Sequence, residues 1–193
     1  MRRVGLFGGT FDPPHLGHLA LAEAARDQLG LERVVFMPAG TPPHKRRRDL
    51  SSAAARVAMT RLAVRGNRAF TVSTLEVNRR GPSFTVDTLT GLKARYVGAR
   101  LYLLIGEDSL GDFGTWHRPA DIIRQATLVV AERPGVRRSA RTLPRVVRLE
   151  NPGLAISSSA IRARVRAGRS VRYLLSDAVE RYVKRHRLYA ESP

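Results

Sequence analysis

This sequence contains no cysteine among its 193 residues. Disulfide bonds, thiolate zinc sites and cysteine nucleophiles are therefore excluded, and the composition fits a reducing compartment. The sequence also lacks any apolar run that approaches the roughly 20 residues of a membrane helix. No secretory leader is visible before the first strand-like residues. We therefore expect a cytoplasmic protein that has no membrane segment.

Lysine is scarce as well, because only three of the 34 basic residues are lysine and the rest are arginine. With 16 acidic residues, the formal net charge is +18. Such a charge points towards nucleic acid, but the arginines are dispersed, and no RNA-recognition aromatic pattern or zinc-finger spacing accompanies them. Small anionic substrates explain the basic clusters equally well, so we expect no specific nucleic-acid partner.

Several catalytic signatures are missing too. The sequence has no Gly-x-Ser-x-Gly elbow, no Walker lysine loop and no His-Glu-x-x-His pair. Its Gly8-Gly9 pair is not the dinucleotide-binding Gly-x-Gly-x-x-Gly. These absences argue against serine hydrolases, P-loop nucleotidases, zinc proteases and hydride-transfer enzymes.

Short β-rich runs alternate with longer helix-like stretches, a pattern typical of a parallel sheet with helices on both faces. The expected strands are Arg3–Phe7, Arg33–Met37, Phe70–Ser73, Leu101–Ile105, Thr127–Ala131 and Val146–Leu149. The expected helices are Leu16–Leu29, Ser51–Val64, Phe84–Tyr96, Ser158–Ala167 and Asp177–Arg187. The fold class is therefore α/β, a Rossmann-like doubly wound parallel sheet with a small C-terminal helical part. We expect one domain over residues 1–193, with a core at 1–150 and a C-terminal serine-motif and helical segment at 151–193.

The most informative motif is Gly8–His18, which joins the first expected strand to the first expected helix. Gly8 and Gly9 let the backbone approach a ligand closely. His15 and His18 fall on one face of the helix start, where free N–H groups and the helix dipole favour an anion. The motif predicts a phosphate-binding pocket with two imidazole donors. The alternative is an ordinary strand–turn–helix in which the histidines only cap the helix.

Two further motifs carry weaker signals. In Pro38–Lys45, proline and glycine form a rigid turn that aims Lys45, a point charge suited to phosphate; the alternative is a solvated basic loop. In Gly81–Leu89, Ser83 fits an N-cap position, and the helix start could receive a carboxylate. A simple helix cap is the alternative there.

The segment Gly106–Trp116 follows the fourth expected strand and is read as a loop. Asp108 at the strand end can accept hydrogen bonds from ribose hydroxyls. Trp116, the only tryptophan, can stack on a heteroaromatic ring or simply pack against the core. Glu107 and Asp108 are adjacent, so their side chains diverge, which disfavours a mechanism based on paired carboxylates.

The last motif, Ile156–Arg162, places three serines before an apolar helix. A serine N-cap and free N–H groups form a second candidate phosphate-binding site, and Arg162 lies one turn into the same helix. This donor-rich set favours phosphoryl or nucleotidyl transfer, in which an enzyme positions its substrates and stabilises charge. An attacking phosphate is already anionic and needs no general base. Mg²⁺ would arrive with a nucleoside triphosphate, so we expect no dedicated protein metal site.

With these motifs, the chain resembles the bacterial nicotinate-nucleotide adenylyltransferases, within a nucleotidyltransferase superfamily related to class I tRNA synthetases. The resemblance covers Gly8–His18, Pro42–Lys45, Gly81–Leu89, Gly106–Trp116, Glu132–Gly135, Ile156–Arg162 and Tyr173–Tyr189. It implies the nucleotidyltransferase form of the Rossmann-like fold and a step of NAD biosynthesis. In that step the adenylyl group of ATP passes to nicotinate mononucleotide with Mg²⁺, giving deamido-NAD and pyrophosphate.

The resemblance also implies residue roles. The catalytic residues would be His18, which stabilises the transition state, His15 and Arg162. Residues that would contact ATP are Gly8, Gly9, Thr10, Phe11, His15, His18, Gly106, Asp108, Ser157, Ser158 and Arg162. Those near the mononucleotide would be Asp12, which also shapes the loop, Lys45 on its phosphate, Thr85 at its carboxylate and Trp116 on its pyridine ring. Phe84 and Ser159 replace the tyrosine and threonine of many relatives without threatening the assignment.

Three alternatives remain open at this point. Phosphopantetheine adenylyltransferases share the first loop and the serine motif, but they are usually shorter and lack the Gly-Pro-Ser-Phe-Thr segment with its tryptophan loop. A preference for nicotinamide mononucleotide is poorly separated by sequence. A basic RNA-binding module without catalysis is favoured by the charge and opposed by the intact His15/His18 pair. The sequence also allows a homo-oligomer.

Overall fold

The computed structural model describes residues 1–41, 50–131, 143–150 and 153–190. Six strands form one sheet in the order β3-β2-β1-β4-β5-β6, and every neighbouring pair is parallel. The strands are β1 (Arg3–Gly9), β2 (Arg33–Pro38), β3 (Phe70–Val72), β4 (Arg100–Gly106), β5 (Ala126–Ala131) and β6 (Val146–Leu149). The expected doubly wound α/β fold is confirmed, and each expected strand is present with ends that differ by at most two residues.

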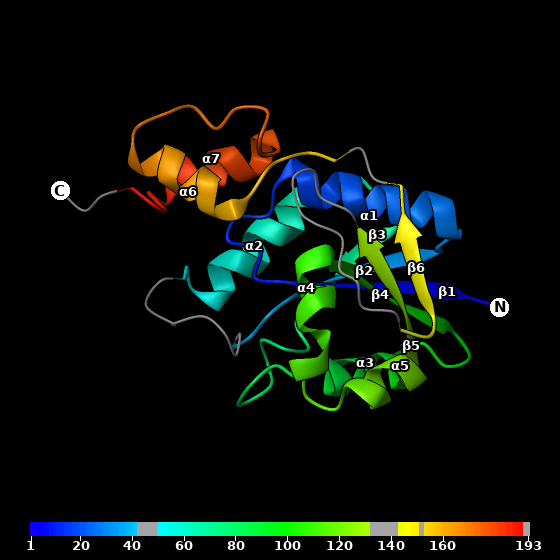
Figure 1. Cartoon of the computed structure of the whole chain (residues 1–193). Helices are drawn as coiled ribbons and strands as arrows, with labels where there is room; N and C mark the ends of the chain where they lie inside the picture. The colour runs from blue at the N-terminus through cyan, green and yellow to red at the C-terminus, as the bar shows by residue number, and fades with distance from the viewer. Residues whose placement is uncertain (42–49, 132–142, 151–152, 191–193) are drawn as a thin grey trace.

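Helices flank the sheet on both faces (Figure 1). They are α1 (Leu16–Leu29), α2 (Ala53–Ala63), α3 (Thr85–Arg95), α4 (Glu107–Gly111), the 3-10 helix η2 (Asp112–Thr115), α5 (Pro119–Gln125), α6 (Ser158–Arg166) and α7 (Asp177–Arg185). Helix α1 ends where Gly30 adopts a left-handed conformation with φ of 56°, which glycine tolerates without strain. Among the described residues, no helix is long and apolar enough to cross a membrane.

The segment after β4 differs from the loop that the sequence predicted. Residues Gly106–Trp116 contain α4 and η2, and α5 follows at once. The acidic pair at the start of α4 complements the helix dipole, and Pro119 opens α5 at a position where proline is favoured. Leu110 and Phe113 are buried, so these short helices gain their stability from core packing.

The core has one apolar layer on each face of the sheet, as expected when parallel strands are buried on both sides. On one face, α1 contributes Leu21, Ala22 and Ala25 to a cluster that includes phenylalanines from β1 and β2. On the other face, α3 and α5 pack onto valine, leucine and isoleucine side chains of β1, β4 and β5. The ends of the central strands are thereby held rigid between the two layers.

A third apolar cluster joins α2 to the C-terminal helices. It contains Met59 of α2, Ile161 of α6 and Val179 of α7, all fully buried. The C-terminal part therefore packs against a helix of the region before residue 150 (Figure 1). The single domain, with its core at 1–150 and its C-terminal segment at 151–193, stays a prediction.

Candidate functional site

Strand order reverses between β1 and β4. Strands β2 and β3 extend the sheet on one side of β1, whereas β4, β5 and β6 extend it on the other. Ligands of open α/β sheets bind beyond the carboxyl ends of the strands at such a switch point. The segments that follow β1 and β4 line one hollow of about 420 Å³ there, here named the first hollow. Gly8, Gly9, His18, Gly106 and Asp108 all belong to its lining.

The two histidines lie side by side at the start of α1. His15 is buried and precedes the helix, and its ring stacks on that of His18 with the centroids 3.6 Å apart. The backbone N–H of His15 donates to His18 Nδ1 at 3.1 Å. A neutral imidazole that accepts at Nδ1 carries its proton on Nε2. His18 can therefore act as an Nε2–H donor at the lining of the first hollow.

The turn before the histidines holds a strained residue. Phe11 has a φ of 51° and is 1% exposed, and a non-glycine residue in this region costs on the order of 1–3 kcal/mol. Its ring meets Phe7 and His18 edge-on, with centroids 5.5 and 5.1 Å apart. A Cβ on Gly9 would lie 2.9 Å from the Phe11 ring, so glycine is required there. This packing fixes the backbone that leads to His18.

The serine motif lies against the same loop. Ser157 caps α6 by accepting from the N–H of Ala160 at 3.1 Å. Ser158 Oγ donates to the carbonyl of Pro13 at 2.8 Å. Arg162 donates to the carbonyl of Asp12, also at 2.8 Å. The two expected phosphate-binding segments, the loop after β1 and the start of α6, are thus adjacent, although the residues in contact are 145 or more positions apart in the chain.

Asp12 is 1% exposed and does not line the first hollow. Its carboxylate accepts from the N–H of Ser51 at 3.0 Å and from the hydroxyl of Tyr189 at 2.6 Å. These bonds link the loop to the segment before α2 and to the C-terminal part, while the expected part of Asp12 in shaping the loop stays a prediction. Its contact with a mononucleotide stays a prediction.

Arg56 of α2 is a buried cation that the sequence did not single out, and it is 2% exposed. Its guanidinium donates to the carbonyls of Ser51, Thr10 and Gly40 at 3.2, 3.0 and 3.3 Å. Burial lowers the pKa of Arg56, and the charge of Asp12 opposes that shift. Arginine stays charged in proteins, so Arg56 supplies a permanent positive charge behind the loop.

The two acidic residues after β4 diverge, as the sequence predicted. Glu107 is 2% exposed and pairs with Arg148 at 2.7 Å. Asp108 is exposed and lines the first hollow. Only Asp108 is therefore placed to meet a ligand from this pair.

A second hollow of about 770 Å³ continues from the first, because Ser83, Thr85, Ser109 and Trp116 line both. Thr85 is the first residue of α3, and half-buried Trp116 packs against Phe113 with centroids 5.4 Å apart. Phe84 stacks on His117 at 4.3 Å. An indole and a further aromatic pair beside a helix start suit a flat ring that carries an anionic group.

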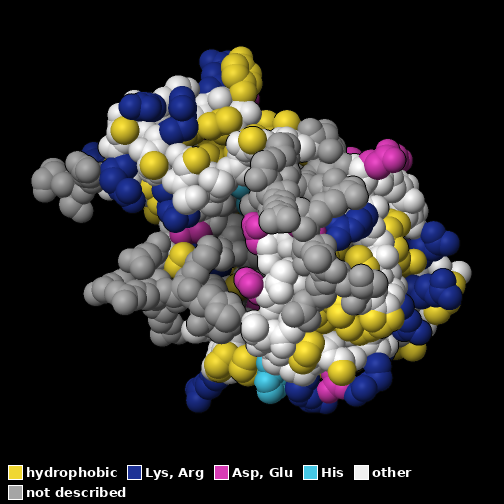
Figure 2. All heavy atoms as spheres, in the orientation of Figure 1, with side chains coloured by type: hydrophobic (Ala, Val, Ile, Leu, Met, Phe, Trp, Pro, Cys, Tyr) yellow, Lys and Arg dark blue, Asp and Glu magenta, His cyan; other side chains and the backbone are white. Residues whose placement is uncertain are grey.

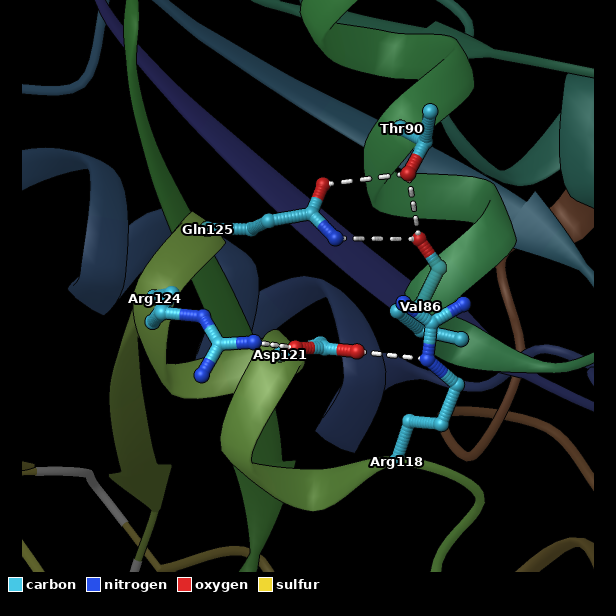
Figure 3. A network of polar contacts seen from close by, with 6 residues as sticks. All are labelled: Val86, Thr90, Arg118, Asp121, Arg124 and Gln125. Atoms are coloured by element: carbon cyan, nitrogen blue, oxygen red, sulfur yellow. Dashed lines mark hydrogen bonds and ion pairs between the residues drawn. The ribbon is translucent and has the colours of Figure 1, made fainter.

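Helices α3 and α5 are joined beside the second hollow (Figure 3). Gln125 accepts from the hydroxyl of Thr90 at 3.2 Å and donates to the carbonyl of Val86 at 3.4 Å. Arg118, which lines this hollow, pairs with Asp121, and Arg124 pairs with the same carboxylate. Gln125, the last residue of α5, thus joins that helix to α3, and the two ion pairs lie within α5 and its N-cap.

Ser83 does not cap α3, which corrects the expectation from the sequence. The N-cap is Phe84, and it makes no side-chain cap bond. Ser83 Oγ instead accepts from the N–H groups of Gly40 and Thr41 at 3.1 and 3.3 Å. The reason is the close approach of the segment after β2, since a Cβ on Gly40 would lie 2.2 Å from the carbonyl oxygen of Glu76.

Glu76 is a buried acid that the sequence did not single out. It is 8% exposed, lines the first hollow and accepts from the hydroxyl of Thr88 at 2.7 Å. Burial raises the pKa of Glu76, against smaller opposing effects of the Thr88 hydrogen bond and the charge of Arg79. Glu76 and Ser83 thus link the end of β2 to the start of α3.

Lys45 and the rest of residues 42–49 lie outside the described residues. Within the described ranges, no group of three or more His, Asp or Glu side chains could hold a metal ion. The first hollow offers mainly imidazole, hydroxyl and backbone donors, which suit phosphate oxygens better than they suit a bare cation.

The chain is similar to several known proteins. Residues 6–164 match the family model for cytidylyltransferase-like proteins. The chain is 47% identical over 197 residues to a probable nicotinate-nucleotide adenylyltransferase of Thermomicrobium roseum, covering 98% of this chain and 92% of that protein. It is 45% identical over 190 residues to its counterpart in Salinibacter ruber, covering 96% and 97%.

In structure, the chain is similar to the nicotinic acid mononucleotide adenylyltransferase of Plasmodium falciparum complexed with NaAD. The TM-score is 0.84, the sequence identity is 17%, and 98% of each chain is covered. At this identity the likeness shows a shared fold. The sequence relatives go further, and by them the chain belongs to the nicotinate-nucleotide adenylyltransferase family.

Proposed function

We propose that this protein transfers the adenylyl group of ATP to nicotinate mononucleotide, giving deamido-NAD and pyrophosphate in NAD biosynthesis. The observation that carries the proposal is the stacked His15/His18 pair at the switch point of the sheet, beside a hollow that continues to Trp116. Phosphate donors and a ring-binding surface thus adjoin in one site. The names of the relatives supply the two substrates.

The reaction is a displacement at the α-phosphorus of ATP. An oxygen of the mononucleotide phosphate forms a bond to that phosphorus, and the bond between the α-phosphorus and the bridging oxygen breaks. Pyrophosphate leaves with the electron pair of that bond. The attacking phosphate is already an anion, so the residues of the site need to position charge and stabilise it rather than remove a proton.

The proposal gives each residue of the site a role. His18 Nε2–H donates to the phosphate oxygens that gain charge, and His15 supports it by stacking. Ser157, Ser158 and Arg162 at the start of α6 hold the departing β- and γ-phosphates. Asp108 accepts from a ribose hydroxyl of the adenosine. Thr85 and Trp116 receive the nicotinate carboxylate and ring, while Lys45 neutralises the mononucleotide phosphate.

A divalent metal such as Mg²⁺ enters with ATP and neutralises charge on its phosphates. The donors at the first hollow fit a phosphate chain that brings its own cation, because a hydrated Mg²⁺ needs few protein ligands. His15, His18 and Arg162 would bind and orient oxygens of that phosphate chain.

Pyrophosphate release from ATP tests the proposal. With ATP and Mg²⁺ present, release should require nicotinate mononucleotide and be much slower with nicotinamide mononucleotide or phosphopantetheine. Equal rates with the first two would broaden the acceptor, and release with phosphopantetheine alone would overturn the proposal. RNA binding without release would favour the non-catalytic module. On the visible face, the Lys and Arg side chains of the described residues lie in several separate places (Figure 2).

A further inference from the structure

The loop that carries the histidines is held from outside itself. Three of its backbone carbonyls accept hydrogen bonds from side chains of α2 and α6: Thr10 from Arg56, Asp12 from Arg162 and Pro13 from Ser158. Immediately after the loop, the N–H of Leu16 donates to the carbonyl of Leu174 at 3.0 Å. The place of the loop is therefore determined largely by the helices packed around it.

The bond between Asp12 and Tyr189 is the longest-range link of this kind. Tyr189 Oη donates to the buried carboxylate at 2.6 Å across 177 residues of chain. Burial and the neighbouring Asp12 carboxylate raise the pKa of Tyr189, so its hydroxyl remains a donor throughout the physiological pH range. If the Asp12 carboxylate lost this donor, a buried charge would be left with one hydrogen bond too few, which destabilises the folded state. The loop would then shift towards another donor or towards water.

Arg56 of α2 is a second support of the loop. Its guanidinium reaches the loop at Thr10 and the segment after β2 at Gly40. Charge-stabilising donors act only when they are already in place, and a displacement of about 1 Å can cost roughly 100-fold in rate. Residues that fix the loop therefore control how well His18 meets the reacting phosphates.

We propose that Tyr189 and Arg56 are positioning residues for adenylyl transfer, which makes the C-terminal segment a working part of the site. They act through Asp12 and Thr10 on the loop that presents His15 and His18, and they do not touch the substrates. The inference rests on the proposed function, because the rate that it concerns is the rate of that reaction.

The test compares Tyr189→Phe with Tyr182→Phe, both of which keep the ring and remove one hydroxyl. Tyr182 packs against the same apolar cluster, and its hydroxyl makes no hydrogen bond with the described residues, so it is a matched control. Steady-state kinetics well below the melting temperature should give a kcat about tenfold lower for Tyr189→Phe. The KM for the mononucleotide should stay within about twofold, and Tyr182→Phe should behave as wild type in both respects.

Hydrogen exchange over residues 8–16 supplies a readout that does not depend on turnover. Tyr189→Phe should exchange these amides faster than wild type and Tyr182→Phe. The proposal needs both the lower kcat and the faster exchange, so either one alone overturns it, as does a lower melting temperature with unchanged kcat. Arg56→Lys keeps the charge but loses the fork of donors, and it should give the same two changes. If it does not fold, Tyr189→Phe decides.

Failure of the proposed function is recognised separately. If the wild-type protein releases no pyrophosphate from ATP and any of the acceptors, the proposed function fails. Affinity for ATP, measured by calorimetry, then replaces the kinetic arm. Weaker binding by Tyr189→Phe with faster exchange supports the positioning role, and unchanged binding overturns it.

Discussion

Two halves of the site meet at Ser83, Thr85, Ser109 and Trp116, and they are held in place by different chemistry. The histidine half, residues Gly8–His18, is supported by the buried ions Asp12 and Arg56 and by donors from the C-terminal part. The tryptophan half, Ser83–Thr85 with Trp116–Arg118, is supported by aromatic packing, by the ion pair of Arg118 with Asp121 near the surface, and by Glu76, whose pKa is raised by burial.

The difference matches what each half has to hold. Phosphates that change charge during a reaction need donors whose places are fixed in advance, because reorganisation would raise the barrier. A flat ring needs surface contact, which an indole supplies over a wide area and with looser geometry. We therefore expect changes in the histidine half to lower kcat, and changes in the tryptophan half to raise the KM for the mononucleotide.

His18→Ala should have the largest effect, a fall in kcat on the order of 10² to 10³, because one preorganised donor is lost from the transition state. Pyrophosphate release under saturating substrates measures it. His186→Ala is the matched control, since His186 is exposed, follows the last helix, and lies with its ring tilted against that of Tyr182. Near-normal turnover in His18→Ala, with the control also normal, would remove His18 from the chemistry.

Trp116→Ala should come second and act on binding. Loss of one ring stack costs roughly 1–3 kcal/mol, which corresponds to about 5- to 150-fold in KM for the mononucleotide. The KM for ATP should stay close to that of wild type if the two halves act separately. A shift in both constants would mean that Trp116 packs the site as a whole, since it also contacts Phe113.

The sequence was sufficient for the sheet and for the residues that carry a strong local pattern. Alternation of strands and helices predicted the parallel sheet, because each element buries its own apolar face. His15 and His18 were paired correctly, since a helix start places residues three apart on one face. The sheet and the histidine pair could both be predicted because they depend on local periodicity, which can be read without knowing the long-range contacts.

The residues that the sequence missed depend on long-range contacts. Ser83 looked like an N-cap, but its hydroxyl accepts from the backbone of residues 40 and 41. Tyr189 gave no local sign of the Asp12 carboxylate that it meets. Arg56 left a usable signal, because helical spacing puts it on the buried stripe with Met59 and Ala63. An arginine on an apolar face has to find partners, and here they are loop carbonyls.

Gly40→Ala tests the backbone that supports the tryptophan half, because Gly40 lies against Glu76 and donates to Ser83. The new Cβ would lie 2.2 Å from the carbonyl oxygen of Glu76, so backbone must move. We expect a loss of about 1–3 kcal/mol in the free energy of unfolding, measured by urea denaturation. Gly111→Ala is the control, because its Cβ would meet nothing within 4 Å and it lies in a helix. An equally stable Gly40→Ala protein would show that the Glu76 segment yields easily.

Glu76→Gln should have the smallest effect of these variants. We expect it to change only how the free energy of unfolding depends on pH. A carboxyl whose folded pKa is raised stays protonated in the native state while the unfolded chain releases its proton. Its contribution to stability is therefore full at low pH and is lost as the pH rises. Urea denaturation from about pH 4 to about pH 7 should show wild type losing stability relative to Glu76→Gln.

Glu23→Gln gives the opposite sign in the same experiment. The hydrogen bond to Arg26 lowers the pKa of Glu23 and outweighs the opposing effect of desolvation. The native state then favours the carboxylate, so wild type should gain stability relative to Glu23→Gln as the pH rises. If Glu76→Gln followed wild type in parallel at every pH while Glu23→Gln diverged from it, burial would not hold Glu76 towards its neutral form. The tryptophan half would then depend on its aromatic packing and on the ion pair of Arg118 with Asp121.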